Sequence, residues 1–506
     1  MIDLKQQILI FIINSLVFLY TVSLITFFIF SLVQLNLLFN YLTNKNITNN
    51  HSKWNFNNKS VIPYVTVQLP VYNEFYVIKG LLNSIEKIKY PKEKIELQVL
   101  DDSNDESSKL IEQITKKMKR KGINIHHIKR NNREGFKAGA LKEGLKKAKG
   151  EFIAIFDSDF LPNKDFLINT IPYFKNPKIG MIQTRWGYLN KDYSILTKIQ
   201  AFALDAHFTL EQVGRNVKKH FINFNGTAGV WRKKTIIDSG NWQEDTLTED
   251  LDLSYRAQLK NWEFLYLEKI ITPSELPVTI GGIRSQQFRW NKGGAENFQK
   301  NIIKVLKSKK INLVTKLHAF AHLLNSTIFL NIFLVSFLSI PLLYYKNQIS
   351  NLKWFFNIST LFFISTFIFY FCYCIINKPK NGYGLISIIN YTIKFIGFYS
   401  LSVAFSAHNS IAVIMGHMRV KSNFIRTPKY NLIDKKNQSV AGKKYFNYSL
   451  NLYMIIESIL SLYFLFGLYL GLVVSDNGDF IFFPFHLFLF LGFGYISIKS
   501  LNEIKL

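Results

Sequence analysis

The chain is 506 residues long, which is room for roughly two to four domains of about 150 residues each. Its formal net charge of +28 comes from 62 Lys and Arg against 34 Asp and Glu, but the excess is mostly Lys scattered along the chain, so the composition argues against a nucleic-acid-binding protein. The 46 Phe and 25 Tyr, with several charge-free stretches of about 20 apolar residues, are instead typical of an integral membrane protein.

The N-terminal stretch 8–38 is apolar, with only scattered uncharged polar residues. It is long enough for one tilted membrane helix and much longer than the apolar core of a signal peptide, which is about 7–15 residues. We therefore expect residues 1–42 to form a retained transmembrane anchor. The only two cysteines, Cys372 and Cys374, lie one residue apart and show neither a disulfide framework nor a metal-binding spacing.

Residues 60–310 have the pattern of an α/β domain, because β-branched runs that end in turns alternate with helical stretches. Strands are expected at 61–70, 95–103, 123–130 and 151–159, with helices at 75–88 and within 137–150. Asp101, Asp102, Asp157 and Asp159 stand at the carboxyl ends of two of these strands. Ligands of open parallel sheets bind at that edge, so these side chains are placed for a ligand.

The DSD string, residues 157–159, follows the apolar strand FIAIF. Two Asp side chains at a strand end offer hard oxygen ligands to Mg²⁺ or Mn²⁺, with phosphate oxygens completing the coordination. The alternative is an ordinary polar turn, since Asp and Ser are common turn residues. The preceding strand and the second acidic pair favour the metal site.

The TED string, residues 248–250, precedes a helical pattern and has two interpretations. Thr248 would cap the helix while Glu249 and Asp250 occupy its first turn, where carboxylates interact well with the helix dipole. One of the two acids would otherwise serve as a general base, which requires reach to the acceptor hydroxyl and a suitable pKa. The residues alone leave both interpretations open.

The QQFRW string, residues 286–290, places Gln286, Arg289 and Trp290 on one face of a helix. Arg289 would neutralise a leaving diphosphate, and Trp290 would offer an apolar platform to a sugar. The alternative is an amphipathic helix on the membrane surface. Both roles fit a helix that lies where an active site meets the bilayer.

Residues 311–506 form a second apolar region. Membrane spans are expected at about 318–344, 354–376, 450–474 and 480–498. The segment 385–417 is apolar, but a crossing there would put the Lys/Arg-rich loop 418–446 on the side opposite the catalytic domain. We therefore interpret 385–417 as interfacial or re-entrant helices, which gives five crossings, an outside N-terminus and an inside C-terminus.

Eight strings between residues 60 and 300 occur together and in order. They are QLPVYNE (68–74), DDSND (101–105), KAGAL (137–141), DSD (157–159), FNGTAGVWR (224–232), TEDLDLSYRA (248–257), ELP (275–277) and QQFRW (286–290). On these strings the chain resembles the family 2 inverting glycosyltransferases, and within them the cellulose-synthase superfamily, most of all the cellulose-synthase-like A and C proteins that make β-1,4-mannan, glucomannan or glucan backbones. The resemblance implies an α/β GT-A fold, Rossmann-like with a mostly parallel sheet, inserted between the transmembrane helices of a multi-pass membrane protein.

The resemblance also implies a role for each matching residue. Donor binding is implied for Pro70, Tyr72, Glu74, Asp101, Asp102, Lys137 and Asp157, and metal binding for Asp157 and Asp159. Acceptor binding is implied for Phe224, Asn225, Gly226, Thr227 and Glu249. Asp250, rather than Glu249, would be the general base, with Gln286, Arg289 and Trp290 holding the diphosphate and the acceptor end.

A further match lies in NFIRTPKY, residues 423–430, which is similar to the gating loop of bacterial cellulose synthase. Phe424, Thr427 and Lys429 match that motif, whereas Arg426 stands where Val is usual. The alternative is a basic juxtamembrane loop. If the match holds, the loop is cytoplasmic, in agreement with the five-crossing topology.

The expected reaction is transfer of a hexose from a nucleotide sugar, GDP-mannose or UDP-glucose, to a growing β-1,4-linked polysaccharide, with Mg²⁺ or Mn²⁺ as cofactor and possible coupled export. One alternative is transfer of a single sugar to a lipid acceptor, as ceramide glucosyltransferase does. Another, of a different class, is a non-catalytic membrane scaffold or channel subunit. The expected location is the plasma or inner membrane, with the catalytic domain in the cytoplasm.

Overall fold

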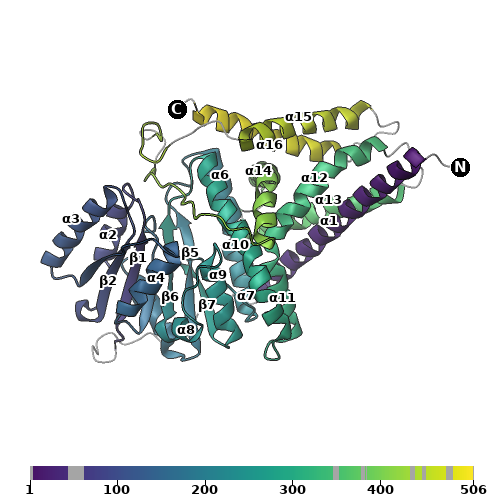
Figure 1. Cartoon of the computed structure of the whole chain (residues 1–506). Helices are drawn as coiled ribbons and strands as arrows, with labels where there is room; N and C mark the ends of the chain where they lie inside the picture. The colour runs from purple at the N-terminus through teal and green to yellow at the C-terminus, as the bar shows by residue number, and fades with distance from the viewer. Residues whose placement is uncertain are drawn as a thin grey trace.

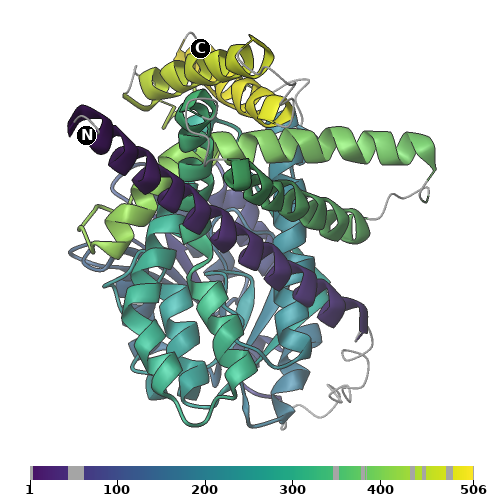
Figure 2. The same cartoon turned by 90° about the vertical axis from the view of Figure 1, so that its right-hand side faces the viewer.

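The structure is a computed structural model that describes residues 4–43, 62–345, 353–377, 382, 384–433, 439–446, 452–473 and 482–504. It has two parts. An α/β domain stands on the left of Figure 1, and long apolar helices from both ends of the chain gather at its upper right. Figure 2 shows the N-terminal helix running diagonally across the face of the molecule, from the apolar helices to the α/β domain.

A seven-stranded sheet in the order β3-β2-β1-β4-β6-β5-β7 forms the centre of the α/β domain. Its strands are β1 (Val65–Val71), β2 (Ile95–Asp101), β3 (Ile125–Lys129), β4 (Phe152–Ile155), β5 (Ile179–Tyr188), β6 (Gly229–Arg232) and β7 (Glu263–Ser274). Neighbouring strands are parallel, except that β6 runs antiparallel to β4 and β5. The predicted mostly parallel sheet is therefore confirmed, and its four predicted strands are β1 to β4.

Helices cover both faces of the sheet, because successive side chains of a strand point to opposite sides. Val67 and Leu69 of β1 pack in one core with α2 (Ile78–Glu86), α3 (Ser107–Arg120) and α5 (Phe166–Thr170). Ile153 and Ile155 of β4 pack in the other with α4 (Phe136–Lys147), α8 (Lys233–Asp238) and α9 (Glu249–Leu259). The carboxyl ends of β1, β2 and β4 are left for ligand-binding residues.

The remaining helices of this part join the sheet to the apolar helices. They are α6 (Ile195–Ala206), a π-helical segment (His207–Val213), α7 (Gly214–Val217), α10 (Ile280–Lys307) and α11 (Leu313–Leu323). Short 3₁₀ segments lie at Lys92–Lys94, Ile171–Lys175 and Asn325–Thr327. The side chain of Thr279 caps α10 by accepting a hydrogen bond from the backbone of Gly282.

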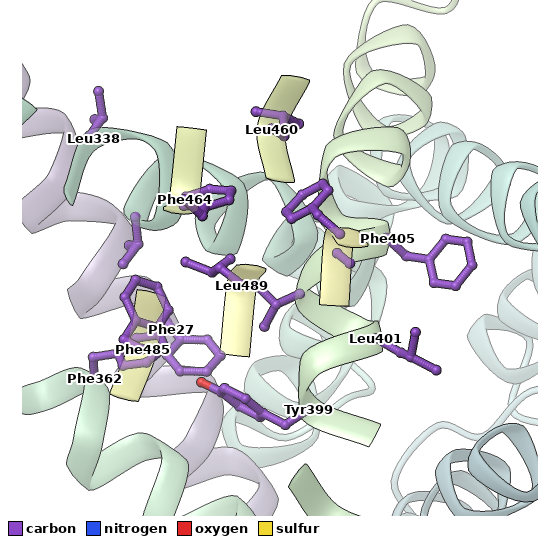
Figure 3. Packing of buried hydrophobic residues seen from close by; sticks show 14 of the residues in the cluster. Phe27, Leu338, Phe362, Tyr399, Leu401, Phe405, Leu460, Phe464, Phe485 and Leu489 are labelled. Carbon is purple, nitrogen blue, oxygen red and sulfur yellow. The ribbon is translucent and has the colours of Figure 1, made fainter. Parts of the chain in front are cut away.

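Within the described residues, six helices are long and apolar enough to cross a membrane. The helices of this part are α1 (Leu4–Thr43), α12 (Ile328–Tyr345), α13 (Lys353–Ile376), α14 (Leu385–His417), α15 (Leu452–Val473) and α16 (Phe483–Ile504). Phe27 of α1 stacks on Phe362 of α13 with ring centroids 5.5 Å apart, and Phe362 meets Phe485 of α16 at 4.5 Å (Figure 3). Large aromatic side chains thus fill the space between helices from the two ends of the chain, as expected of an integral membrane protein.

One expected span begins later than predicted. Residues 318–323 belong to α11, and the candidate span Asn325–Tyr345 consists of a short 3₁₀ segment followed by α12. Polar contacts explain the difference: Thr315 bonds to His220 at 2.9 Å, and His322 bonds to Tyr255 at 2.9 Å, so α11 lies against the α/β domain.

The segment 385–417 is one continuous helix, α14, rather than several. A re-entrant segment would need a break where the chain turns back, and α14 has none. By length and composition α14 is among the six candidate spans. The predicted interfacial orientation and the count of five crossings remain predictions.

Buried charged side chains connect the start of α10 to the apolar helices. The guanidinium of Arg284, only 5% exposed, forms an ion pair with Glu457 of α15 and donates a hydrogen bond to Ser500 of α16 at 3.0 Å. The backbone N–H of Ile280 donates to the carboxylate of Glu503 at 3.0 Å. Removal of one partner of such a buried pair leaves an uncompensated charge, so the start of α10 is firmly placed.

Candidate active site

A cavity opens at the carboxyl ends of β1 and β4, between α9, α10 and the loop that follows α14. Predicted residues from distant strings line it together: Pro70, Tyr72, Glu74, Asp102, Lys137, Asp157, Asp159, Asn225, Gly226, Glu249, Asp250, Gln286, Arg289, Trp290, Phe424, Thr427 and Lys429. Cavities that combine an apolar lining with a few convergent polar groups are the usual form of a ligand site. The fold therefore brings the predicted donor, metal, base and loop residues to one place.

The DSD string lies immediately after β4. The backbone N–H of Asp157 donates to the hydroxyl of Thr227 at 2.9 Å, which fixes the turn. One carboxylate oxygen of Asp157 accepts from Lys137 Nζ at 2.5 Å, and one of Asp159 accepts from Lys429 Nζ at 2.8 Å. Each carboxylate thus has one oxygen paired with a lysine.

The donor set fits a divalent cation that arrives with a nucleotide. Among the residues that the structure describes, no group of three or more His, Cys, Asp or Glu is arranged to hold a metal alone. Two carboxylates fit Mg²⁺ or Mn²⁺ when phosphate oxygens and water complete the coordination, as in other nucleotide sites. Asp157 and Asp159 are the residues that would hold such an ion.

The helix of the TED string begins at Glu249, with Thr248 as the residue before it. Of the two interpretations of this string, the side-chain cap is not observed, because the Thr248 hydroxyl makes no capping hydrogen bond. That hydroxyl instead accepts from Asn297 Nδ2 of α10 at 3.0 Å. Thr248 therefore ties the start of α9 to the helix that carries Arg289.

Asp250 has the environment of a base. Its pKa is raised to about 7, chiefly by burial and also by the neighbouring charge of Glu249, while Lys137 lowers it. The backbone of Gly226 lies beside it, since a Cβ at Gly226 would stand 3.0 Å from Asp250 Oδ2. Gly226 also has a φ of +80°, which only glycine adopts without strain. Residue 226 thus leaves space directly in front of the Asp250 carboxylate.

Gln286, Arg289 and Trp290 share one face of α10, as predicted, and that face lines the cavity. Arg289 Nη2 donates to the hydroxyl of Thr427 at 3.0 Å, and its guanidinium lies 4.6 Å from the centre of the Phe424 ring. Burial lowers the pKa of Arg289 from its usual value, whereas the carboxylates of Asp157 and Glu249 raise it. A guanidinium stays charged in proteins. A cation is thereby held beside the DSD carboxylates.

The loop after α14 enters the cavity. Phe424 stacks on Phe136 with ring centroids 5.6 Å apart, and Arg426 Nη1 lies 2.9 Å from Glu74 Oε2. The pKa of Glu74 is raised to about 8, because the effect of burial exceeds the opposing effect of Arg426. Arg426, the position at which this chain departs from the gating-loop motif, therefore makes a specific contact with a predicted donor residue.

The acceptor loop is linked to the N-terminal helix by a chain of hydrogen bonds. The Asn225 amide oxygen accepts from Gln212 at 2.7 Å, and its nitrogen lies 3.1 Å from His207 Nε2. The other ring nitrogen of His207 lies 3.1 Å from Glu211, which accepts from Gln34 of α1 at 2.9 Å. The amide of Asn225 is therefore oriented by the π-helical segment and α1.

Three predicted site residues lie outside the cavity lining. Asp101 is buried, where it accepts from Ser108 at 2.7 Å and contacts His127 at 2.8 Å, so it organises the β2 edge. Phe224 is fully buried against Trp231, and Thr227 holds Asp157 as described above. These side chains support the site from behind.

Sequence reasoning missed Arg133, Arg426 and Glu275 among the cavity-lining residues. Arg133 lies 3.3 Å from the centre of the Tyr72 ring, in a loop whose sequence carries no structural signal. Glu275 belongs to the ELP string, so a signal was present, but its partners lie about 155 residues away in the chain. Such contacts follow from the tertiary fold alone.

Comparisons with known proteins show which proteins this chain is similar to. Residues 63–293 match the model of glycosyltransferase-like family 2. Over 264 residues the chain is 45% identical to a probable glucomannan 4-β-mannosyltransferase of Oryza sativa subsp. japonica, covering 51% of this chain and 48% of that protein. It is 43% identical over 261 residues to a glucomannan 4-β-mannosyltransferase of Cyamopsis tetragonoloba, covering 51% and 50%. The chain thus spans about half the length of the curated relatives it matches.

A solved structure shares the fold at low sequence identity. It is a mannosyltransferase of Pyrobaculum calidifontis in complex with GDP-mannose and Mn²⁺, 16% identical, with a TM-score of 0.50 over 77% of this chain and 99% of that one. This likeness concerns the fold, and it agrees with the predicted GT-A architecture. Residues 63–293 of the α/β domain thus match glycosyltransferase-like family 2, and glucomannan 4-β-mannosyltransferases are among the proteins to which the chain is similar.

Proposed function

We propose that this protein is a membrane-embedded inverting glycosyltransferase that moves a hexose from a nucleotide sugar, GDP-mannose or UDP-glucose, to a growing β-1,4-linked polysaccharide. One observation carries the proposal: Asp250, the Asp157 and Asp159 carboxylates and Arg289 line the same cavity. These are the base, the metal ligands and the leaving-group cation that such a transfer requires. The glucomannan 4-β-mannosyltransferase relatives supply the substrate class.

The proposed reaction is a single displacement. Asp250 accepts the proton of the acceptor hydroxyl, whose oxygen bonds to the anomeric carbon as the bond from that carbon to the nucleotide diphosphate breaks. Attack on the face opposite the diphosphate inverts the anomeric carbon, so an α-linked donor gives a β-linked product. Arg289 donates hydrogen bonds to the departing diphosphate. A divalent cation on Asp157 and Asp159 would neutralise part of the same charge.

Two alternative functions would give different reaction products. Transfer of one sugar to a lipid would give a single small product, and a scaffold or channel subunit would give none with any donor. The matches to glucomannan 4-β-mannosyltransferases and the acceptor string FNGTAGVWR support the polymer. Coupled export of that polymer is part of the proposal, and product size from the purified protein in detergent decides between the alternatives.

We further propose a cytoplasmic catalytic domain and five crossings. Arg426 and Lys429 contact Glu74 and Asp159, so the loop after α14 lies on the same side of the membrane as the α/β domain. If α12 crosses the membrane and α13 crosses back, α14 begins on the side of the α/β domain. The loop after α14 lies on that same side, so α14 does not cross, as expected of an interfacial helix. The Lys/Arg-rich composition of this loop supports the cytoplasmic side.

Removal of divalent metal is expected to stop transfer. The two aspartates do not offset the diphosphate charge without a cation, so excess EDTA should lower the rate of sugar release from GDP-mannose or UDP-glucose by at least about 100-fold. Addition of Mn²⁺ or Mg²⁺ should restore it. Undiminished transfer in excess chelator would contradict the assignment of Asp157 and Asp159.

The pH dependence of transfer is expected to follow Asp250. Its carboxylate must be ionised to accept a proton, and its pKa is raised to about 7 by burial. Below that pH the carboxyl is protonated, so kcat/KM should fall as the pH drops and should level off above about 7. A rate that stays constant from about pH 5.5 to 8 would argue against Asp250 as the base.

A further inference from the structure

Glu275 follows the end of β7 and points at the loop after α14. Its side chain is buried, with 4% of the residue exposed. Its two carboxylate oxygens accept hydrogen bonds from three successive backbone N–H groups, those of Tyr430 at 3.1 and 3.2 Å, Asn431 at 2.7 Å and Leu432 at 3.3 Å. A single side chain therefore holds the backbone of three consecutive residues more than 150 positions later in the chain.

The local conformation of the loop makes this contact specific. Asn431 has a φ of +54°, in the left-handed region, and a left-handed residue among others turns successive N–H groups to one side, where they form a small anion-binding hollow. Leu432 is fully buried and packs with Tyr430, Val278 and Val440. Burial raises the pKa of Glu275, while Lys429 and the N–H groups of the loop lower it.

The backbone of Glu275 connects the same loop to the metal ligand. Its N–H donates to Asp159 Oδ2 at 3.3 Å, and its carbonyl accepts from Lys429 Nζ. Lys429 Nζ in turn donates to Asp159 Oδ2 at 2.8 Å. Residue 275 therefore touches both the carboxylate that would hold the cation and the lysine that the loop brings to it.

We propose that Glu275 is the docking residue of the loop 424–433: its carboxylate seats the backbone of residues 430–432, and this seat places Thr427 on Arg289 and Lys429 on Asp159. Glu275 is a positioning residue, because it acts on the reaction through the loop. Its effect on catalysis rests on the proposed function, whereas docking of the loop does not. The two are therefore tested by different measurements.

Hydrogen–deuterium exchange of the purified full-length protein in detergent tests the docking. In the wild type, the peptide amides of residues 430–432 should be protected. In Glu275→Gln one accepting oxygen becomes a donor that faces other donors, so these amides should exchange at least about 10-fold faster, while the amides of β1 and β4 keep their wild-type rates. Glu275→Asp, which keeps the charge on a shorter side chain, should restore part of the protection.

Two further variants complete the exchange experiment. Glu112→Gln makes the same chemical change on the exposed surface of α3, where the side chain is 48% exposed, and should leave the loop amides unaltered. Asn431→Pro removes the donor of the 2.7 Å bond and, because proline fixes φ at about −65°, also the left-handed conformation of residue 431. It keeps Glu275, so it should release the loop even if Glu275→Gln fails to fold.

The turnover experiment is separate. Glu275→Gln and Asn431→Pro should lower kcat/KM for the nucleotide sugar by a similar factor, with Glu112→Gln at the wild-type value. Wild-type exchange rates for residues 430–432 in the folded Glu275→Gln protein would overturn the proposal, as would unprotected amides there in the wild type. If loop exchange responds as expected but no variant, wild type included, transfers sugar, the docking stands and the proposed function fails.

Discussion

Asp250→Asn is expected to lower the rate of glycosyl transfer by about 100- to 10,000-fold, the range over which a positioned general base acts. Asparagine has the same shape and keeps the space in front of Gly226, but its amide does not accept the proton of the acceptor hydroxyl. The cavity wall and the carboxylates of Asp157 and Asp159 stay in place, so binding of GDP or UDP with Mn²⁺ should change little. Steady-state transfer and isothermal titration with the nucleotide measure the two effects.

Asp165→Asn is the matched control for this variant. Asp165 has a side chain that is 42% exposed and faces Lys89 at 3.5 Å on the surface. The same chemical change there should leave transfer at the wild-type rate. Full activity of Asp250→Asn would remove Asp250 from the mechanism, and equal loss of transfer and nucleotide binding would make it a structural residue.

Arg289→Ala is expected to lower kcat by about 100- to 1,000-fold, as removal of one positioned donor to a developing anion does. Arg289 is the cation of α10 that lines the cavity, and it is held there by Thr427 and Phe424. Arg289→Lys keeps the charge but loses the planar fork that binds two oxygens, so it should recover only part of the rate. Single-turnover measurements with saturating nucleotide sugar separate this effect from donor binding.

Arg120→Ala, at the exposed end of α3, is the control for Arg289→Ala and should behave as the wild type. The assignment of Arg289 to the leaving group would be contradicted if Arg289→Ala raised KM for the donor with kcat unchanged. That result would mean that Arg289 contributes equally to the ground state and the transition state.

Much of the α/β domain could be predicted because its strands are local patterns. The apolar runs that form β1 and β4 end in turns and alternate with helices. This alternation predicts a parallel sheet before any contact is known. The acidic residues at their carboxyl ends were expected at a ligand site, and Asp102, Asp157 and Asp159 line the cavity. The helical face of Gln286, Arg289 and Trp290 followed from spacing alone.

The parts that could not be predicted depend on contacts between distant residues. The four-residue strand β6 runs antiparallel between β4 and β5, and a run this short within FNGTAGVWR carries no periodicity. Thr248 has the residue type of a helix cap, yet Asn297, some 50 positions later, occupies its hydroxyl. The burial of Asp101 with His127 and Ser108, and the docking of the loop on Glu275, likewise depend on packing.

The most direct test of the account is the product formed by the purified full-length protein in detergent from radiolabelled GDP-mannose or UDP-glucose with Mn²⁺, analysed for size and then digested with linkage-specific glycanases. We expect a polymer made from at least one of the two donors and cleaved by an endo-β-1,4-mannanase or an endo-β-1,4-glucanase. A product that carries a single sugar on a lipid, an α-linked product, or no product from either donor would contradict the proposed polysaccharide synthase.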